Sequence, residues 1–199
     1  MLEKAYQQFK KSSYQWRAKY FQPILKLLTK MKITPNQITL GRTVFFIPII
    51  YCFFLENLTG VLIFYLLFWF FDLLDGSLAR YQNVSHDKGR FLDSVVDNFA
   101  YGLIIVGFIY LEAAIVWLLA YNILIELTVQ VLGTIRQKAN WQSNWLINVQ
   151  PDLPWFKSIS HLVLFLFYIG LDVLNPTYFI LNILMTCLAL YLLFKINKD

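Results

Sequence analysis

The sequence has little charge and little sulfur for its length. Charged residues make up 15% of its 199 residues, well below the roughly 25% that is usual for soluble domains. There are two cysteines, Cys52 and Cys187, and neither has the spacing of a metal ligand, which argues against a zinc-stabilised fold. Both lie in apolar stretches, which favours buried thiols, and the sequence leaves a disulfide between them open.

Apolar and aromatic residues are abundant instead, at 58% and 18% of the chain. A membrane-spanning helix needs about 20 mostly apolar residues. Residues 91–136 form an apolar run that is too long for one span, so we place a turn near Glu112. We predict an all-α integral membrane protein with six transmembrane helices, at residues 36–56, 60–82, 91–111, 113–136, 157–173 and 176–194. The alternative is a soluble helical bundle with an unusually apolar surface.

The distribution of basic residues predicts the orientation of these spans. All 17 Lys and Arg residues lie in or next to the termini and every second connection of the six-span arrangement, so they fall on one side of it. This is the positive-inside pattern, and it predicts that both termini and the active site lie on the cytoplasmic side. We therefore attribute the net charge of +5 to the orientation of the spans and to attraction to anionic lipid, not to nucleic-acid binding.

Residues 1–33 differ from the rest of the chain because they are basic and amphipathic. Their apolar side chains recur near helical spacing with lysines between them. We predict one or two amphipathic helices on the cytoplasmic membrane surface, interrupted near Pro23. A solvated helix that packs on the bundle is the alternative. Residues 34–199 then form the transmembrane domain.

The segment Thr34-Pro35-Asn36-Gln37 is a strong helix start. Thr34 suits the N-cap, Pro35 the first helical position, and Gln37 completes a capping box. A helix N-terminus at the membrane surface also offers free N–H groups and a positive dipole end to a phosphate. The pattern alone supports both interpretations equally, a phosphate-binding end and a well-formed start to the first span.

Four acidic residues lie within 26 residues, inside the second and third predicted spans. Asp72 and Asp75 are three residues apart, and Asp93 and Asp97 are four apart, so each pair shares one helical face. The two spans are consecutive and antiparallel, which predicts that the four carboxylates converge near the cytoplasmic surface. Acidic residues within membrane spans are costly and usually functional.

Four carboxylates in a low dielectric need a positive partner. Arg80 alone is insufficient. Hard divalent cations bind carboxylate oxygens, and magnesium sites often include substrate phosphates. Two such ions can bind the attacking and leaving oxygens of a displacement at phosphorus. The residues therefore predict a two-metal phosphoryl-transfer site that is open to the cytoplasm and within reach of a lipid.

Small residues and an arginine surround the acids, at Gly76, Ala79, Arg80 and Gly89. Glycine lets a backbone or a nucleotide approach closely, and arginine can form paired hydrogen bonds with phosphate oxygens, although helix packing and membrane anchoring are alternatives. The complete run of eight residues resembles the signature of the CDP-alcohol phosphotransferase family, with all spacings matched: Asp72-x-x-Asp75-Gly76-x-x-Ala79-Arg80, eight residues, Gly89, three residues, Asp93, three residues, Asp97.

The resemblance implies roles for these residues. Asp72, Asp75 and Asp93 would bind metal, and Asp97 would face the metal and act as the general base on the acceptor hydroxyl. The CDP moiety would be held by residues of two segments, namely Gly76, Ala79 and Arg80 in the signature and Pro35, Asn36, Gln37 and Ile38 ahead of it. The resemblance also implies two divalent ions, Mg²⁺ or Mn²⁺, release of CMP, and a homodimer.

The acceptor is less defined by the sequence. Arg136, Lys138 and Lys157 flank the predicted fourth loop and are candidates for binding an acceptor phosphate, and membrane anchoring explains them equally well. Family members that use inositol phosphate carry additional arginines around the acceptor pocket, whereas spans five and six have none. We favour CDP-diacylglycerol as donor and a small polar alcohol as acceptor.

Three alternative functions stay open at this point. One is transfer from CDP-choline or CDP-ethanolamine to diacylglycerol. The others belong to different classes, a divalent-cation transporter and a non-catalytic membrane partner. A transporter would place its carboxylates near the middle of the bilayer, with a polar path on both sides.

Overall fold

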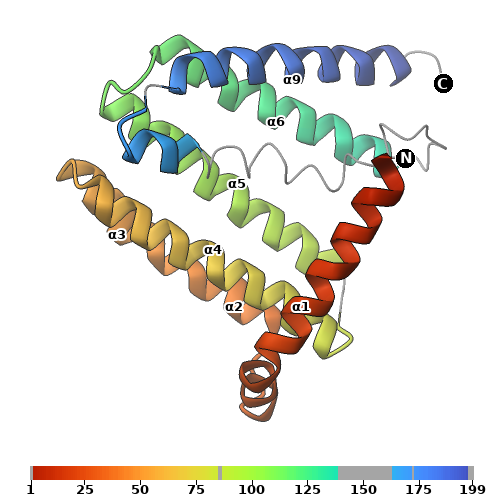
Figure 1. Cartoon of the computed structure of the whole chain (residues 1–199). Coiled ribbons are helices and arrows are strands. Elements are labelled where there is room, and N and C mark those ends of the chain that lie inside the picture. The colour runs from red at the N-terminus through yellow and green to blue at the C-terminus, as the bar shows by residue number, and fades with distance from the viewer. Residues whose placement is uncertain (1, 85–86, 139–162, 172, 197–199) are drawn as a thin grey trace. The chain divides into compact units, whose positions relative to one another are not determined.

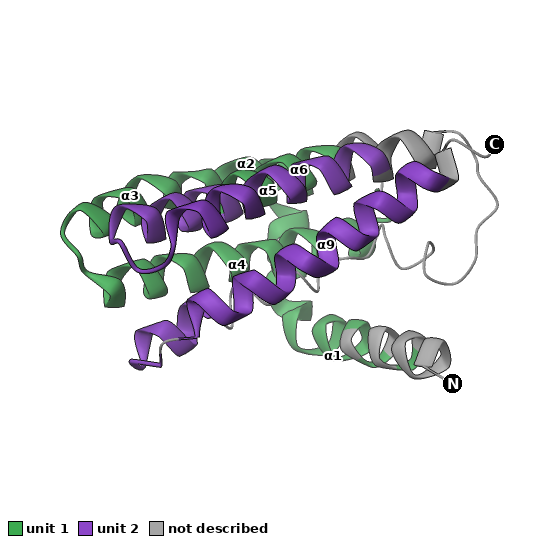
Figure 2. Cartoon of the chain, turned by 90° about the horizontal axis from the view of Figure 1, so that it is seen from above, with its two compact units in different colours: residues 1–100 green, residues 101–199 purple. Residues whose placement is uncertain are grey.

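The computed structural model describes residues 2–84, 87–138, 163–171 and 173–196, and all regular secondary structure in these ranges is helical (Figure 1). This confirms the predicted all-α class. The chain divides into two compact units, residues 1–100 and 101–199 (Figure 2).

Helix α4 is the centre of the first unit. It packs against the other helical elements that precede it in the chain. The elements of this unit are α1 (Leu2–Lys30), α2 (Pro35–Gly41), a 3₁₀ turn (Arg42–Phe45), α3 (Phe46–Phe54), α4 (Leu58–Tyr81) and the first part of α5 (Asp87–Tyr110). An apolar cluster of Leu25, Ile38, Leu74 and Leu78 joins α1, α2 and α4. This cluster fixes the position of α2 against the half of α4 that carries the acidic residues.

Helix α1 runs without a break through Pro23, so the predicted interruption at that residue is wrong. Burial of Leu25 against α4 holds the helix together across the proline. Five other apolar side chains of α1, at helical spacing, are exposed, namely Trp16, Tyr20, Ile24, Leu27 and Met31. This stripe suits a lipid surface, and the position of α1 on the membrane stays a prediction.

The start of α2 has the predicted capping box. The Thr34 Oγ1 atom accepts a hydrogen bond from the backbone N–H of Gln37 at 3.3 Å, and Gln37 Oε1 accepts one from the Thr34 N–H at 2.8 Å. Pro35 occupies the first helical position, where its missing N–H has no consequence. The local sequence therefore determines where the first membrane helix begins.

Four of the six predicted spans are present as helices long and apolar enough to cross a bilayer: Pro35–Phe54, Leu58–Tyr81, Phe91–Tyr110 and Leu174–Phe194. The fourth predicted span corresponds to α6 (Val116–Lys138), whose apolar part, Val116–Leu132, is shorter. The predicted fifth span, 157–173, lies partly outside the described residues, so the count of six stays a prediction. The chain nevertheless has the helices of an integral membrane protein.

Several helices end in the same way, with a residue in the left-handed conformation. Glu112 has φ of 52° after α5, and its N–H and that of Ala113 donate to the carbonyls of Ile109 and Phe108. This is the pattern of a Schellman motif. It confirms the turn predicted near Glu112, which divides the long apolar run into α5 and α6.

In the second unit, α6 packs against α9 (Leu174–Ile196) through an apolar core and a buried polar chain. Tyr101 donates to Asn122 Oδ1, Asn122 donates to Asn182 Oδ1 at 2.7 Å, and Asn182 donates to the Leu118 carbonyl at 2.9 Å. Hydrogen bonds of this kind join helices where lipid offers no polar partner. These hydrogen bonds fix how α6 and α9 are aligned along their lengths.

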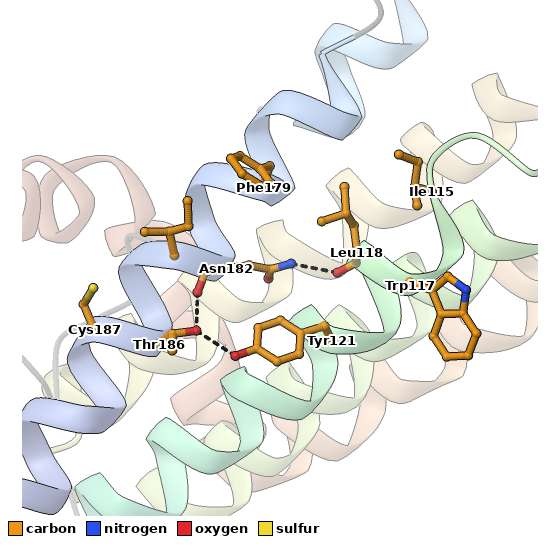
Figure 3. Close-up of a pocket in the computed structure, with 9 residues that line it drawn as sticks. Ile115, Trp117, Leu118, Tyr121, Phe179, Asn182, Thr186 and Cys187 are labelled. Atoms are coloured by element: carbon orange, nitrogen blue, oxygen red, sulfur yellow. Dashed lines mark hydrogen bonds between the residues drawn. The ribbon is translucent and has the colours of Figure 1, made fainter.

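A groove of about 630 Å³ lies between α6 and α9, and its lining residues are drawn in Figure 3. Trp117 and Phe179 line it, together with Tyr121, whose hydroxyl is 2.8 Å from Thr186 Oγ1. Cys187 also lines the groove and is exposed, so the prediction of a buried thiol is wrong there, whereas Cys52 is buried as predicted. Both cysteines are free thiols.

Candidate functional site

The structure brings the four predicted carboxylates together around one arginine, Arg42. Its Nη1 atom donates to Asp72, and its Nη2 atom donates to Asp93 and lies 2.9 Å from Asp97 Oδ1. Its Nε atom lies 3.8 Å from Asp75 Oδ2. The guanidinium is the positive partner that four clustered carboxylates require. Sequence analysis did not assign this role to Arg42.

Arg42 lies at the buried side of the cluster, and three of the four carboxylates lie at its open side. The arginine side chain is 0% exposed, whereas those of Asp72 and Asp97 are 27% exposed and that of Asp93 is 40% exposed. Among the residues that the structure describes, none is a hydrogen-bond partner of the buried Nε atom. A ligand that reaches the cluster therefore meets carboxylate oxygens first and the guanidinium beneath them.

A 3₁₀ turn in the first membrane span positions Arg42. The turn covers Arg42–Phe45 and interrupts the α-helical hydrogen bonding between α2 and α3. Pro48 follows in the first turn of α3, and proline has no N–H to give to the carbonyl four residues earlier, which is that of Val44. A 3₁₀ stretch within a helix often marks a functional hinge or a sequence under strain. Here the stretch begins at the residue that enters the acidic cluster.

The aromatic ring of Phe68 closes the apolar side of the site. The Arg42 guanidinium lies 4.6 Å from the Phe68 ring centroid, within the range of a cation–π interaction. Phe46 packs on Phe68 with its centroid at 5.4 Å and on Phe99 with its centroid at 5.2 Å. These rings exclude water from one side of the guanidinium and strengthen its attraction to the carboxylates.

Thr39 orients the most buried of the four carboxylates. Its Oγ1 atom donates to Asp75 Oδ2 at 2.8 Å and lies 3.2 Å from the Pro35 carbonyl. Thr39 is 3% exposed and Asp75 is 4% exposed. A hydrogen bond to a buried carboxylate fixes which oxygen faces the cluster. Sequence analysis missed Thr39 as well.

The donor set fits a hard divalent cation. Asp72, Asp75 and Asp93 each offer one carboxylate oxygen, and these three oxygens lie within 4.8 Å of one another. Mg²⁺ and Mn²⁺ prefer such oxygen ligands and complete their coordination with water and phosphate. Arg42 touches the same carboxylates, so any ion shares them with the guanidinium.

The cluster lies near one end of the membrane helices. Arg42 is seven residues from the start of the span Pro35–Phe54, and Asp93 and Asp97 are near the start of Phe91–Tyr110. Seven residues of helix correspond to about 10 Å, whereas the middle of the hydrocarbon core is about 15 Å from its edge. This position suits a site open to one membrane surface rather than a path through the bilayer.

Two guanidinium groups lie next to the acidic cluster, on one tyrosine ring. The Arg80 guanidinium is 4.3 Å from the Tyr14 ring centroid, and that of Arg17 is 5.0 Å from the same centroid. Burial lowers the pKa of Arg17, although the negative charge of Asp72 opposes this shift. Two arginines held close together on a ring favour an anion such as a phosphate. Sequence analysis predicted Arg80 as a phosphate ligand and missed Arg17 and Tyr14.

The other predicted donor-binding residues have different surroundings. Asn36 and Gln37 are exposed at the start of α2, whereas Ile38 is buried in the apolar cluster. A Cβ atom built on Gly89 would lie 3.0 Å from Asn36 Oδ1, so glycine allows the start of α5 to approach Asn36. Gly76 lies beside Arg80 on α4, and Ala79 is half-buried in the next turn.

The predicted acceptor residues lie outside the described side chains. Arg136 and Lys138 belong to the end of α6, where side chains are not described, and Lys157 lies in 139–162. Glu126 is buried in α6, and Gln130 donates to its Oε1 atom at 3.2 Å. The groove between α6 and α9 in Figure 3 is lined mainly by apolar side chains and offers no carboxylate. The chemistry of the described residues is therefore concentrated in the first unit.

Residues 32–194 match the family model described as CDP-alcohol phosphatidyltransferase. The chain belongs to this family. The matched residues include all four aspartates, Arg42 and Arg80.

The relatives of this chain include two named synthases. The phosphatidylinositol phosphate synthase of Corynebacterium glutamicum is 34% identical over 108 residues, which are 51% of this chain and 43% of the relative. The archaetidylinositol phosphate synthase of Pyrococcus horikoshii is 36% identical over 96 residues, 46% of this chain and 50% of the relative. The match thus spans half or less of these relatives.

Solved structures of Mycobacterium tuberculosis phosphatidylinositol phosphate synthase share the fold. The structure with CDP-DAG bound has a TM-score of 0.55 at 20% identity and covers 64% of this chain and 67% of its own. The structure with manganese and citrate has a TM-score of 0.53 and covers 61% and 62%. At this identity the likeness concerns the fold alone.

Proposed function

We propose that this protein transfers a phosphatidyl group from CDP-diacylglycerol to the hydroxyl of a small polar alcohol and releases CMP. A bond forms between the acceptor oxygen and the lipid phosphorus, and the bond from that phosphorus to the CMP oxygen breaks. The observation that carries the proposal is the convergence of Asp72, Asp75, Asp93 and Asp97 at one end of the membrane helices, in a chain of this family.

Asp97 is the general base in this proposal. An alcohol has a pKa far above 7, so its proton must pass to a base as the oxygen attacks. The Arg42 Nη2 atom is 2.9 Å from Asp97 Oδ1 and holds this carboxylate in the cluster. The proton moves from the acceptor hydroxyl to Asp97, and CMP leaves with the electron pair of the broken bond. No serine or cysteine nucleophile is required.

Asp72, Asp75 and Asp93 would hold Mg²⁺ or Mn²⁺, because their oxygens form a group of suitable size. A bound divalent ion supplies Lewis acidity and neutralises charge on the diphosphate. Thr39 keeps Asp75 oriented for this purpose. The manganese in a solved structure of the same fold supports this assignment.

The arginines beside the cluster would hold the diphosphate of the donor. Arg80 and Arg17 share the Tyr14 ring, next to Gly76 of the signature. Arg17 is on α1, the helix with the exposed apolar stripe, so the donor would be held between a surface helix and the membrane helices. CDP-DAG in a solved structure of the same fold supports a CDP-linked lipid as donor.

The acceptor is an alcohol. The names of the relatives favour inositol phosphate, whereas the absence of arginine from residues 157–194 counts against a phosphorylated acceptor bound there. Glycerol 3-phosphate, serine and inositol complete the set of small polar alcohols to be tested. The positive-inside distribution of Lys and Arg supports a site on the cytoplasmic side.

The test measures CMP release by purified protein with CDP-diacylglycerol and Mg²⁺ or Mn²⁺, across this panel of acceptors. Metal-dependent release with one acceptor is expected, and it identifies that acceptor. Protein with Asp97→Asn serves as the control for contaminating activity. Absence of release with every acceptor, and also with CDP-choline or CDP-ethanolamine and diacylglycerol, would overturn the proposal. Metal flux into liposomes would then point to transport.

A further inference from the structure

Tyr14 of α1 contacts two arginines that belong to different helices. The Cζ atom of Arg80, on α4, is 4.3 Å from the centroid of the Tyr14 ring. That of Arg17, three residues after Tyr14 on α1, is 5.0 Å from the same centroid. Both distances are within the range of a cation–π interaction. The ring therefore joins a guanidinium of α1 to a guanidinium of the signature helix α4.

The two guanidinium groups repel each other and need a partner of opposite charge. Arg17 and Arg80 are near enough for the charge of one to act on the other. Asp72 attracts Arg17 and Asp75 attracts Arg80, but both carboxylates belong to the acidic cluster. The negative face of an aromatic ring offsets part of the repulsion as well. Tyr14 therefore makes it less costly to hold the two arginines together.

We propose that Tyr14 is a positioning residue of the donor site, and that its ring holds Arg17 and Arg80 together so that both bind the diphosphate of the nucleotide donor. This inference rests on the proposed transfer from a CDP-linked lipid and adds α1 to its site. A guanidinium carries five N–H donors, and contact with a ring leaves these donors to phosphate oxygens. Arg80 is exposed, whereas Tyr14 and Arg17 are half-buried, so a phosphate can reach the arginines while the ring supports them.

Other contacts hold α1 against α4 further along the helix. Leu25 is buried in the apolar cluster that α1 shares with α2 and α4. The Gln82 Nε2 atom donates to the Thr29 hydroxyl at 3.2 Å and to the Ile33 carbonyl at 3.1 Å. These contacts are more than two helical turns from Tyr14 along α1. A substitution of Tyr14 should therefore release the arginines without detaching the helix.

The test measures the affinity of the protein in detergent with Mg²⁺ for CDP, by calorimetric titration, and for cytidine, by competition. Tyr14→Leu is expected to lower the affinity for CDP about tenfold, as for the loss of two weak cation–π contacts. The affinity for cytidine, which has no phosphate, should stay the same. Unchanged affinity for CDP would overturn the inference. An equal loss for cytidine would also overturn it, because the ring would then contact the base.

Two further variants show whether the ring itself is required. Tyr14→Phe keeps the ring and should bind CDP as wild type does, and a loss as large as that of Tyr14→Leu would overturn the inference. Tyr20→Leu is the matched control. Tyr20 is on the same helix and also has a basic neighbour, with Lys19 Nζ 5.8 Å from its ring centroid, but it belongs to the exposed apolar stripe. Its substitution should leave the affinity for CDP unchanged, and an equal loss there would indicate a general effect of α1 and overturn the inference.

A double-mutant cycle shows whether Tyr14 acts through Arg17. Arg17→Gln should itself weaken CDP binding, and combining it with Tyr14→Leu should cost less than the product of the two single losses, because the ring then has less to hold. Losses that multiply fully would indicate independent roles and overturn the inference. Arg17→Gln also decides the question if Tyr14→Leu does not fold, since unchanged affinity for CDP would show that α1 supplies no phosphate ligand.

CMP release separates this inference from the proposed function. In Tyr14→Leu the KM for CDP-diacylglycerol should rise about tenfold with kcat nearly unchanged, because the arginines bind the donor equally before and during transfer. CMP release by wild type together with an unchanged KM in Tyr14→Leu would overturn the inference alone. Absence of both CMP release and CDP binding in wild type would overturn the inference and the proposed function together.

Discussion

The guanidinium of Arg42 lies on the face of the Phe68 ring, 4.6 Å from its centroid, while its nitrogens face the aspartates. Phe68 is 3% exposed, so water does not reach this face of the arginine. A charge that is desolvated on one side interacts more strongly with partners on the other. The ring thus makes Arg42 an effective counter-charge for the acidic cluster.

Phe68→Leu should destabilise the protein in chelator by about 1–2 kcal/mol, because it removes the ring contact with the arginine. Phe46→Leu is the matched control. It also loses an aromatic contact with Phe68 and another with Phe99, but the direct contact between arginine and ring remains. Thermal unfolding of both variants measures the difference. An equal loss in the two variants would show that the contact with Arg42 contributes nothing.

Thr39→Val should weaken Mn²⁺ binding by about 10–100-fold, because loss of a hydrogen bond to a metal-binding carboxylate disturbs its orientation. The hydroxyl of Thr39 donates to Asp75 at 2.8 Å, and valine has nearly the same shape. Thr43→Val is the control, since the Thr43 hydroxyl donates to the Leu40 carbonyl within the same segment. Titration with Mn²⁺ compares the two. Equal Mn²⁺ affinities of the two variants would show that the Thr39 hydroxyl does not support the metal site.

Asp97→Asn and Asp93→Asn should separate the base from the metal ligands. Asp97→Asn is expected to lower CMP release by about 10²–10⁴-fold, the usual contribution of a general base, with little loss of Mn²⁺ binding. Asp93→Asn should lose both CMP release and Mn²⁺ binding, because Asp93 belongs to the group of three carboxylates proposed to bind metal. If Asp97→Asn retains full turnover, another group accepts the proton.

Local signals made much of the fold predictable. The capping residues Thr34 and Gln37 determine the start of the first span, and the spacing of Asp72 and Asp75 places both on one face of a helix. These features depend on neighbours within one helical turn. The turn near Glu112 could be predicted because the apolar run 91–136 is too long for a single span.

Features that depend on packing between helices could not be predicted in the same way. Pro23 would normally interrupt a helix, but burial of Leu25 against α4 keeps α1 continuous. The four acids require a positive charge among them, and Arg42 is the basic residue inside the preceding predicted span, 36–56. Its entry into the cluster depends on the 3₁₀ turn ahead of Pro48 and on Phe68, and spacing alone reveals neither.

Gly76→Ala distinguishes a glycine needed by the protein from one needed by a ligand. A Cβ atom at residue 76 would meet Arg80 Nη1 at 3.6 Å, an ordinary contact, so nothing in the described structure prevents alanine there. Alanine is the better helix former, and the variant should gain about 0.5–1 kcal/mol of stability. If the CDP moiety lies against Gly76, however, its affinity should fall at least about tenfold, as expected for a loss of 1.4 kcal/mol.

Gly102→Ala is the matched control for this variant. Gly102 also lies inside a membrane helix, and a Cβ atom built on it meets nothing within 4 Å. It should therefore gain similar stability without any change in CDP affinity. Calorimetric titration with CDP and thermal unfolding measure the two quantities. A Gly76→Ala protein that binds CDP as tightly as wild type would remove this glycine from the donor site, and a destabilised one would show that the helix packing requires it.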